Sequence, residues 1–247
     1  MKVQRELNMS IFNATYKGIP IKSDSRVHAA VMEVLQRKSL CKHKITTYLD
    51  VATGKGALAQ RLIDVFPNIE IDCNDLEDGI LAVGARSIFS IDLNEDFDFG
   101  CKYDVVLAVE VIEHLENPFH FIRNLKKHLN PGGFILLTTP NTDSLFDRLW
   151  HLYYGHSFYF GEPGIVNSGG HITMTPEWLL RHIALTENLD FEMMSNMIDS
   201  RGLIGIKGRL ILALFYPLRF FIKNLNDRSG NVCVFRSRDA SQKLNDK

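Results

Sequence analysis

The chain has 247 residues, of which 45% are hydrophobic and 23% charged, a composition that suits one large α/β domain with a sizeable core. Its formal net charge of −1 provides no basic field with which to hold nucleic acid. The four cysteines lie far apart and form no C-x-x-C pair, which favours reduced thiols in a cytoplasmic protein over disulfides or a zinc site. The first residues also lack the apolar core of a signal peptide.

Residues 1–40 are predicted to form an N-terminal arm followed by a helix. The first 22 residues lack periodicity and are expected to be irregular. Ser23 or Asp24 is a suitable N-cap, and the apolar residues that follow recur at helical spacing along one face.

The segment 45–63 carries the strongest functional signal. An apolar, β-prone run at 45–51 meets Gly54 and Gly56 and then passes into a helical pattern. A strand, a glycine turn and a helix in that order place bare backbone and a helix N-terminus beside a ligand. A second apolar strand ends near Asp75, whose carboxylate can accept hydrogen bonds from ribose hydroxyls. This constellation predicts a site for a nucleoside-containing cofactor.

The segment 45–142 is predicted to be the cofactor-binding core. A helix is expected at 119–129, and strands are expected at 69–73, 88–92, 103–109 and 134–139. Strands that alternate with helices predict a parallel sheet covered on both faces.

Beyond the core, residues 143–175 are rich in aromatic residues, glycine and histidine and have weak periodicity, so we expect an irregular lid over the substrate. The C-terminal part, 176–235, is expected to open with a helix that has Thr175 as N-cap and Pro176 in its first turn. Two further strands, at 191–198 and 231–235, are expected to close the sheet.

An apolar insertion at 203–224 interrupts this C-terminal part. Its fully apolar stretch is too short to span a bilayer, and Lys207, Arg209 and Arg219 punctuate it. One interpretation is an interfacial helix with snorkelling basic side chains, which predicts a peripheral membrane contact through 203–222 at the cytoplasmic face. The other is a hydrophobic hairpin packed on the domain or on a second subunit. The oligomeric state stays open.

Three segments of the core resemble motifs of class I S-adenosylmethionine-dependent methyltransferases. The segment 49–56 (Leu-Asp-Val-Ala-Thr-Gly-Lys-Gly) resembles the glycine-rich first motif, 103–118 the fourth-strand motif and 130–141 the fifth-strand motif, in the family's order and spacing. The most similar subgroup comprises ubiquinone-type O-methyltransferases and methyltransferases of bacterial surface-glycan gene clusters. In the latter, a Thr-Pro-Asn segment leads through an aromatic stretch to a His-Ile-Thr, as 139–141 and 171–173 do here.

The resemblance implies a single Rossmann-like domain, with a doubly wound, mostly parallel, seven-stranded sheet and S-adenosylmethionine as cofactor. It also implies roles for seven residues. Asp50 would organise the methionine end of the cofactor, and the backbone at Ala52, Gly54 and Gly56 would contact that end. Asp75 would bind the ribose hydroxyls, and Asp92 would accept a hydrogen bond from the adenine amino group. Glu110 would face the methionine end or the substrate mouth. The alternatives are a turn-forming role for Asp75 and a surface turn for Asp92.

The glycine loop departs from the family pattern at two positions. Ala52 stands where the family usually has its first glycine, and an alanine is accommodated there if its φ is negative. Lys55 is an unusual cation within the loop, and its side chain either points outward or reaches the carboxylate of the cofactor.

Methyl transfer requires mainly alignment of the acceptor and exclusion of water. A hydroxyl acceptor must in addition lose its proton, and His171, on a glycine-flexible loop, is the preferred general base. The alternative for His171 is a lid histidine that caps the helix at Thr175. No spacing of histidine or cysteine suggests a metal site, so none is predicted. The expected acceptor is a small molecule, a glycan or a lipid-linked molecule rather than nucleic acid.

Two other functions are weighed against this prediction. Gly54-x-Gly56-x-x-Ala59 fits a dinucleotide fingerprint, as in a NAD(P)-dependent oxidoreductase. Asp50 would then repel a pyrophosphate, and no Tyr-x-x-x-Lys pair exists for hydride chemistry on a carbonyl. The second alternative is a non-catalytic binding or assembly protein that keeps the fold, which the departure at Ala52 would favour.

Overall fold

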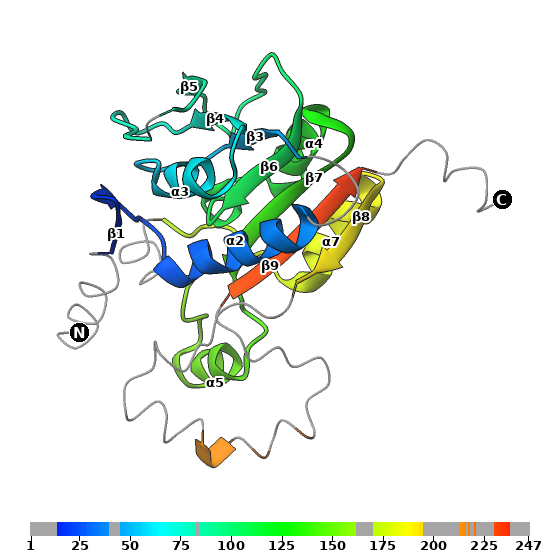
Figure 1. Cartoon of the computed structure of the whole chain (residues 1–247). Helices are drawn as coiled ribbons and strands as arrows, with labels where there is room; N and C mark the ends of the chain where they lie inside the picture. The colour runs from blue at the N-terminus through cyan, green and yellow to red at the C-terminus, as the bar shows by residue number, and fades with distance from the viewer. Residues whose placement is uncertain are drawn as a thin grey trace.

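A seven-stranded sheet forms the centre of the computed structural model (Figure 1), which describes residues 14–39, 45–82, 84–161, 170–194, 213–215, 217, 220 and 230–237. In spatial order its strands are β5 (Ser87–Phe89), β4 (Glu70–Asn74), β3 (Thr47–Asp50), β6 (Tyr103–Val109), β7 (Leu129–Pro140), β9 (Gly230–Ser237) and β8 (Leu189–Met193). The strands from β5 to β7 are parallel to their neighbours, and only β9 runs antiparallel, between β7 and β8. The expected seven-stranded, mostly parallel sheet is confirmed.

Helices cover both faces of the sheet. The helical elements are α2 (Ser25–Ser39), α3 (Ala57–Val65), η1 (Ile112–His114), α4 (Pro118–Lys127), α5 (Leu145–Tyr154) and α7 (Glu177–Thr186). Alternation along β6 shows how the faces divide, because successive side chains of a strand point to opposite sides. Val105 and Leu107 pack with α2 and α3, whereas Val106 and Ala108 pack with α4 and α7. In Figure 1, α2 crosses in front of the sheet.

The order of the strands reverses between β3 and β6. This reversal lies in the middle of the sheet, and the edge discussed below is the one formed by the carboxyl ends of these strands. The chain moves outward from β3 through β4 to β5 and then returns to β6, which pairs in parallel with the other side of β3. In open α/β sheets, ligands bind outside the carboxyl ends of the strands at such a switch point. Asp50 ends β3 and Glu110 follows β6, so both residues lie at this edge.

The structure corrects the expectation of an irregular arm before residue 23. Two short strands, β1 (Thr15–Tyr16) and β2 (Ile19–Pro20), pair as an antiparallel hairpin. Lys17 and Gly18 form its turn with φ values of 50° and 81°. The hairpin lacks a periodic signal because its strands are so short, and it is held by packing of its apolar side chains on Ala57 of α3.

The lid segment is also more regular than expected, because it contains α5. Ser144 caps this helix by accepting a hydrogen bond from the Asp147 amide at 3.1 Å, and Gly155 ends it in the left-handed conformation. The expected N-cap of α7 is wrong as well. The cap is Pro176, while the buried hydroxyl of Thr175 lies 2.9 Å from that of Thr139 on β7. Tertiary contact therefore overrides the capping preference of Thr175.

Most of the insertion at 203–224 lies outside the described residues. Within it, the side chains of Leu214 and Phe220 are 74% and 80% exposed. In the described part of the chain, no helix combines the length and the apolar character needed to cross a bilayer. Both interpretations of the insertion stay predictions.

Candidate active site

The glycine loop between β3 and α3 has the backbone that its sequence predicts. Gly54 and Gly56 have φ values of 57° and 90°, in the left-handed region that favours glycine. A Cβ atom on Gly56 would lie 2.8 Å from the Cβ of Ala82 and 2.9 Å from its amide nitrogen. Gly56 is therefore required both by its conformation and by the close approach of the chain after β4.

The two departures from the family pattern leave this loop intact. Ala52 is absent from the residues with positive φ, so a side chain is tolerated there without strain. The ammonium of Lys55 lies 2.5 Å from the carbonyl oxygen of Asp78 and 3.7 Å from the carboxylate of Glu77. Lys55 is thus engaged by the loop after β4.

Asp50 presents one carboxylate oxygen without a partner. Its side chain is buried, and the Thr53 hydroxyl donates to Oδ2 at 2.8 Å. No donor among the described residues reaches Oδ1. Burial, together with the charge of Asp75, raises the pKa of Asp50 to about 7. A buried oxygen of this kind fits a ligand with a cationic or hydrogen-donating end, such as the methionine part of S-adenosylmethionine.

Asp75 joins the two loops of this edge. Its Oδ2 accepts from the Gly54 amide at 2.6 Å, and its Oδ1 accepts from the Glu77 amide at 2.9 Å, as in an Asx turn. A carboxylate oxygen has more than one acceptor site, so these bonds leave capacity for ribose hydroxyls. Both the turn and the loop contact are present, and the ribose role stays a prediction.

Asn74 is a residue that the sequence reasoning missed. Its buried amide nitrogen donates to the carbonyl oxygens of Val51 and Ile91 at 2.9 and 3.1 Å, and its Oδ1 accepts from the Ile91 amide at 2.8 Å. One side chain thereby ties the ends of β3 and β4 to the chain after β5. A polar residue at the carboxyl end of β4 was the only available signal.

Asp92 lies beyond the sheet, because β5 ends at Phe89 and the strand expected to reach residue 92 is shorter. Its side chain is exposed, and Oδ1 accepts from the Asn94 amide at 2.9 Å. The surface turn is thus present. A contact of Asp92 with the adenine amino group stays a prediction.

Glu110 follows β6 in a strained conformation, with φ at 49° although it is not a glycine. Such strain is often found at functional sites. Its backbone amide donates to the Thr138 hydroxyl oxygen at 2.9 Å, and that hydroxyl donates to Oε1 at 2.7 Å. Burial and the nearby charge of Asp24 raise the pKa of Glu110. This edge of the sheet therefore contains a carboxyl group that holds its proton more tightly than usual.

His171 reaches this region on the chain that returns from the lid. Its Nδ1 donates to the carbonyl oxygen of Tyr159 at 3.1 Å, and its ring lies edge-on to that of His114, with centroids 4.7 Å apart. Burial, with a further contribution from His114, lowers the pKa of His171 to about 4. The ring is therefore neutral at pH 7 and a weaker base than an ordinary histidine.

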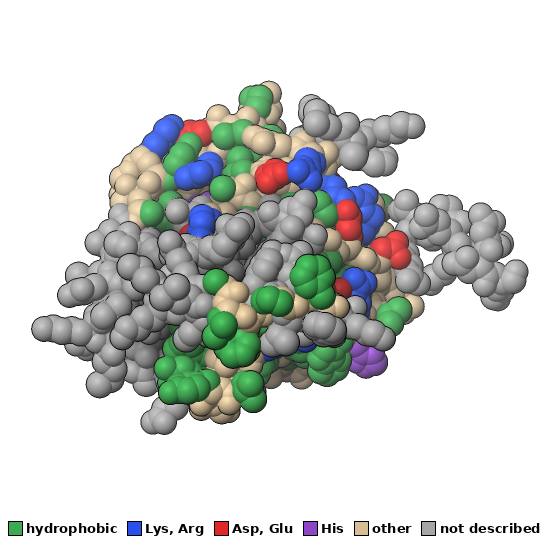
Figure 2. Space-filling view, turned by 90° about the horizontal axis from the view of Figure 1, so that it is seen from below, with side chains coloured by type: hydrophobic (Ala, Val, Ile, Leu, Met, Phe, Trp, Pro, Cys, Tyr) green, Lys and Arg blue, Asp and Glu red, His purple; other side chains and the backbone are tan. Residues whose placement is uncertain are grey.

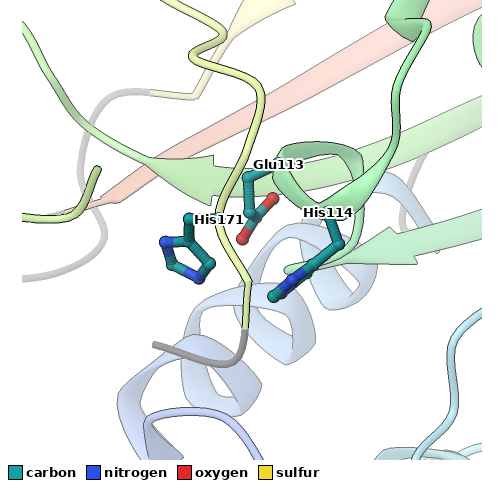
Figure 3. A group of neighbouring side chains, drawn as sticks. All are labelled: Glu113, His114 and His171. Carbon is teal, nitrogen blue, oxygen red and sulfur yellow. The ribbon is translucent and has the colours of Figure 1, made fainter. Parts of the chain in front are cut away.

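Glu113, His114 and His171 form a group that the sequence reasoning did not anticipate (Figure 3). Glu113 and His114 belong to η1, whereas His171 lies far along the chain, so no sequence spacing relates them. The backbone amides of Ile172 and Thr173 donate to the Glu113 carbonyl oxygen at 2.9 and 3.0 Å and hold the two segments together.

A model of a family described as a methyltransferase domain matches residues 23–195. The chain belongs to this methyltransferase family. Its cofactor is S-adenosylmethionine, which the family uses, and membership of a methyltransferase family argues against the nicotinamide-dependent alternative.

Individual relatives of this methyltransferase are similar over shorter parts. A malonyl-(acyl-carrier protein) O-methyltransferase of Halalkalibacterium halodurans is 25% identical over 144 residues, which are 53% of each protein. A ubiquinone biosynthesis O-methyltransferase of Rickettsia conorii is 49% identical over 47 residues, 19% of this chain and 16% of the relative. The chain thus spans about half, or less, of the length of these relatives.

Solved methyltransferases share the fold. The plantazolicin methyltransferase BamL, in complex with SAH and a triazolic desmethyl analogue, superposes with a TM-score of 0.59 at 16% identity. The superposition covers 86% of this methyltransferase and 85% of BamL. At this identity the likeness establishes the Rossmann-like architecture alone.

Proposed function

We propose that this methyltransferase transfers the methyl group of S-adenosylmethionine to an oxygen atom of a small-molecule, glycan or lipid-linked acceptor. The observation that carries the proposal is the set of acid and imidazole groups, Glu110, Glu113 and His171, at and after the carboxyl end of β6 and on the chain that returns from the lid. Such groups can orient a hydroxyl and receive its proton. The O-methyltransferase names of the relatives support the same choice of acceptor atom.

In this proposal the cofactor lies along the carboxyl ends of β3 to β5. Asp50 orders the methionine end through its unpartnered Oδ1, with the backbone at Ala52, Gly54 and Gly56 beside it. Asp75 binds the ribose hydroxyls and Asp92 the adenine amino group. Glu110 faces the methionine end and the acceptor.

In this proposal the described part of the lid predicted at 143–175, residues 143–161 and 170–175, covers the acceptor side of the core at 45–142, and contacts among these residues fix its conformation. Buried Asp147 of α5 accepts from the Ser157 hydroxyl at 2.8 Å and from the Phe158 amide at 2.6 Å. These bonds position Tyr159, whose carbonyl oxygen orients His171. Water exclusion by such a lid protects the transfer and aligns the acceptor with the methyl group.

His171 is our candidate for the group that takes the acceptor proton. Because Nδ1 is the donor to Tyr159, Nε2 carries the free electron pair. With a pKa of about 4, this ring accepts a proton efficiently only from a hydroxyl that a further group has acidified.

A contact with a membrane surface, in a cytoplasmic protein, completes the proposal. Exposed apolar side chains gather on the face shown in Figure 2. The most exposed apolar residues of the described chain include Leu152 and Tyr153 of α5, at 83% and 81%, and Leu214 and Phe220 of the insertion. Such a surface favours an amphiphilic acceptor. Flotation of the protein with anionic liposomes that is weakened by Leu214→Asp would support this contact, and absence of flotation would remove it.

The function is tested by supplying S-adenosylmethionine with a labelled methyl group and panels of phenols, glycans and lipid-linked sugars. We expect an O-methylated product from one panel and its loss in Asp75→Ala. Binding of S-adenosylmethionine without transfer to any panel would favour the non-catalytic alternative. Methylation at nitrogen or carbon would overturn the choice of acceptor atom.

A further inference from the structure

Three potential metal ligands converge beside the cofactor crevice, from two segments that are distant in sequence. A carboxylate oxygen of Glu113 and ring nitrogens of His114 and His171 all lie within 4.8 Å of one another. Figure 3 shows the carboxylate of Glu113 directed between the two rings. A metal ion bound at ~2.0–2.2 Å from each donor would require these atoms to approach to about 3–3.5 Å, a change within reach of side-chain rotation.

Glu113 supplies the observation that points to a ligand. Its side chain is fully buried, and neither carboxylate oxygen has a hydrogen-bond partner among the described residues. Buried charged groups are normally paired or coordinate a metal, because an unpaired one is costly. The carboxyl group is directed at two imidazoles, as expected of a ligand whose cation is the missing partner.

His171 is already in the tautomer that a ligand requires. Its Nδ1–H is donated to the Tyr159 carbonyl oxygen, which leaves the Nε2 electron pair available. Metal-binding histidines usually make such an outer hydrogen bond, which fixes the tautomer and the direction of the ring.

The backbone holds the two ligand segments in register. Ile172 and Thr173 donate their amides to the Glu113 carbonyl oxygen, and the Thr173 hydroxyl donates to the Leu115 carbonyl oxygen at 2.5 Å. The residues on either side of the three ligands are therefore joined to each other without a metal. A site organised in this way loses little conformational entropy when a cation binds.

We propose that Glu113, His114 and His171 bind one first-row divalent transition-metal cation, such as Mn²⁺, Co²⁺ or Zn²⁺. Two imidazoles and one carboxylate favour these cations over Mg²⁺ and Ca²⁺, which prefer all-oxygen sites. Three protein ligands leave coordination positions open, as in catalytic metal sites. The prediction that this chain has no metal site, made from spacing alone, is replaced by this proposal.

A second part of the proposal concerns the role of this cation in catalysis, and it rests on the proposed O-methyl transfer. An acceptor hydroxyl on the cation would lose its proton more readily, and His171, whose Nε2 then binds the cation, would be a ligand in place of the base. The S–CH₃ bond of the sulfonium breaks, an O–CH₃ bond forms, the cofactor leaves as a neutral thioether and the hydroxyl proton goes to solvent. Two neighbouring oxygens would chelate the cation, so the acceptor class is a vicinal diol or a catechol-type phenol.

The test is a titration of the full, chelator-treated protein with Mn²⁺ alone. Binding is monitored by calorimetry and, separately, by the electron paramagnetic resonance signal of the Mn²⁺ that remains free. We expect one ion bound per chain and a loss of affinity of about tenfold or more in Glu113→Gln and in His171→Gln. The matched control, His182→Gln, changes an exposed histidine of α7 and should bind as the unchanged protein does. Circular dichroism verifies that each variant is folded.

The outcomes separate the metal site from the function. No saturable binding of Mn²⁺, Co²⁺ or Zn²⁺ by the folded protein, or equal binding by all variants, overturns the site even if methyl transfer is found. Binding that depends on Glu113 and His171 supports the site even if no acceptor is methylated. Transfer to a vicinal diol or catechol that stops with chelator and returns with Mn²⁺ supports the second part, and transfer unaffected by chelator overturns it.

Discussion

Two parts of the active-site edge differ in how many of their polar side chains are hydrogen-bonded within the protein. At the cofactor edge, formed by the glycine loop 51–56 and the chain after β4, Asp75 accepts from two backbone amides and Asn74 makes three hydrogen bonds. At the acceptor edge, formed by Glu110, Glu113, His114 and His171, one buried carboxylate has no donor in the described structure and Glu110 is held in a strained conformation. The loops of the first edge satisfy each other's polar groups, although Asp50 beside them keeps one unpartnered oxygen, whereas the second edge leaves both oxygens of the Glu113 carboxylate without a donor among the described residues.

The difference reflects how the two edges are built. The cofactor edge consists of backbone and short side chains, fixed by strands that are adjacent in the sheet. The acceptor edge is assembled from a helical turn and the end of a lid, and its unpaired groups lower stability until a ligand arrives. Such local conflict is expected where function rather than folding selects the residues.

The largest effect on stability and cofactor binding is expected from Gly56→Ala, which changes a closely packed residue of the cofactor edge. The added Cβ meets the chain at Ala82, and the left-handed backbone is unfavourable for alanine. We expect a loss of about 3 kcal/mol in the free energy of unfolding, measured by urea denaturation, together with loss of cofactor binding. Gly18→Ala is the matched control, because Gly18 has φ at 81° but open space around it, and should cost only about 1–2 kcal/mol. Equal losses would show that the approach to Ala82 is unimportant.

Asp75→Ala removes the carboxylate that joins the two loops. The affinity for S-adenosylhomocysteine, measured by calorimetry, should fall by about tenfold to a hundredfold, since hydrogen bonds to a charged group contribute about 1.5–3 kcal/mol. Asp78→Ala changes an exposed carboxylate of the same loop and should leave the affinity unchanged. The same fall in both variants would assign the effect to loop disorder.

Asp50 makes cofactor binding depend on pH. Its folded pKa of about 7 lies above the value of an unfolded aspartate, so its contribution to stability is present below about pH 4 and is lost as the pH rises to about 7. The cationic methionine end prefers the ionised form, so the affinity for S-adenosylmethionine should rise about tenfold from pH 6 to pH 8. Asp50→Asn should bind weakly and without this rise. An equal rise in the variant would point to another group.

Glu113→Met should stabilise the protein in the presence of chelator, in contrast to Gly56→Ala at the cofactor edge. It replaces a buried carboxylate that lacks a partner by an apolar side chain of similar volume, and we expect a gain of about 1–2 kcal/mol in chemical denaturation. Glu187→Met is the control, because Glu187 is also buried but pairs with Arg123 at 2.9 Å, and it should lose stability. A loss for Glu113→Met would mean that its carboxyl group is satisfied in solution.

Lys55→Met should have the smallest effect. The ammonium is engaged by Asp78 and Glu77, and a half-exposed pair of this kind contributes at most about 1 kcal/mol. The affinity for S-adenosylmethionine should change by less than about twofold, an effect too small to resolve without replicate calorimetry. A tenfold loss would show instead that Lys55 reaches the carboxylate of the cofactor.

The sequence by itself determined the cofactor edge and the order of the core. Two glycines after an apolar run fix a tight loop whatever surrounds it, because the left-handed backbone they adopt is costly for other residues. Asp75 was identified from its place after a predicted strand, and the family resemblance pointed to Asp50 and Glu110. The parallel pairing of their strands brings these carboxyl ends to one edge. These signals are local, so neighbouring residues suffice to read them.

Only the tertiary structure decided the acceptor edge. Thr175 looks like an N-cap in sequence but pairs with Thr139, and His171 meets Glu113 and His114 through backbone bonds between η1 and the end of the lid. The helix α5 and the terminal hairpin likewise escaped prediction, because packing on other elements stabilises short segments whose own periodicity is weak. Contacts between distant segments depend on how the faces of the sheet are covered, and no spacing along the chain records that.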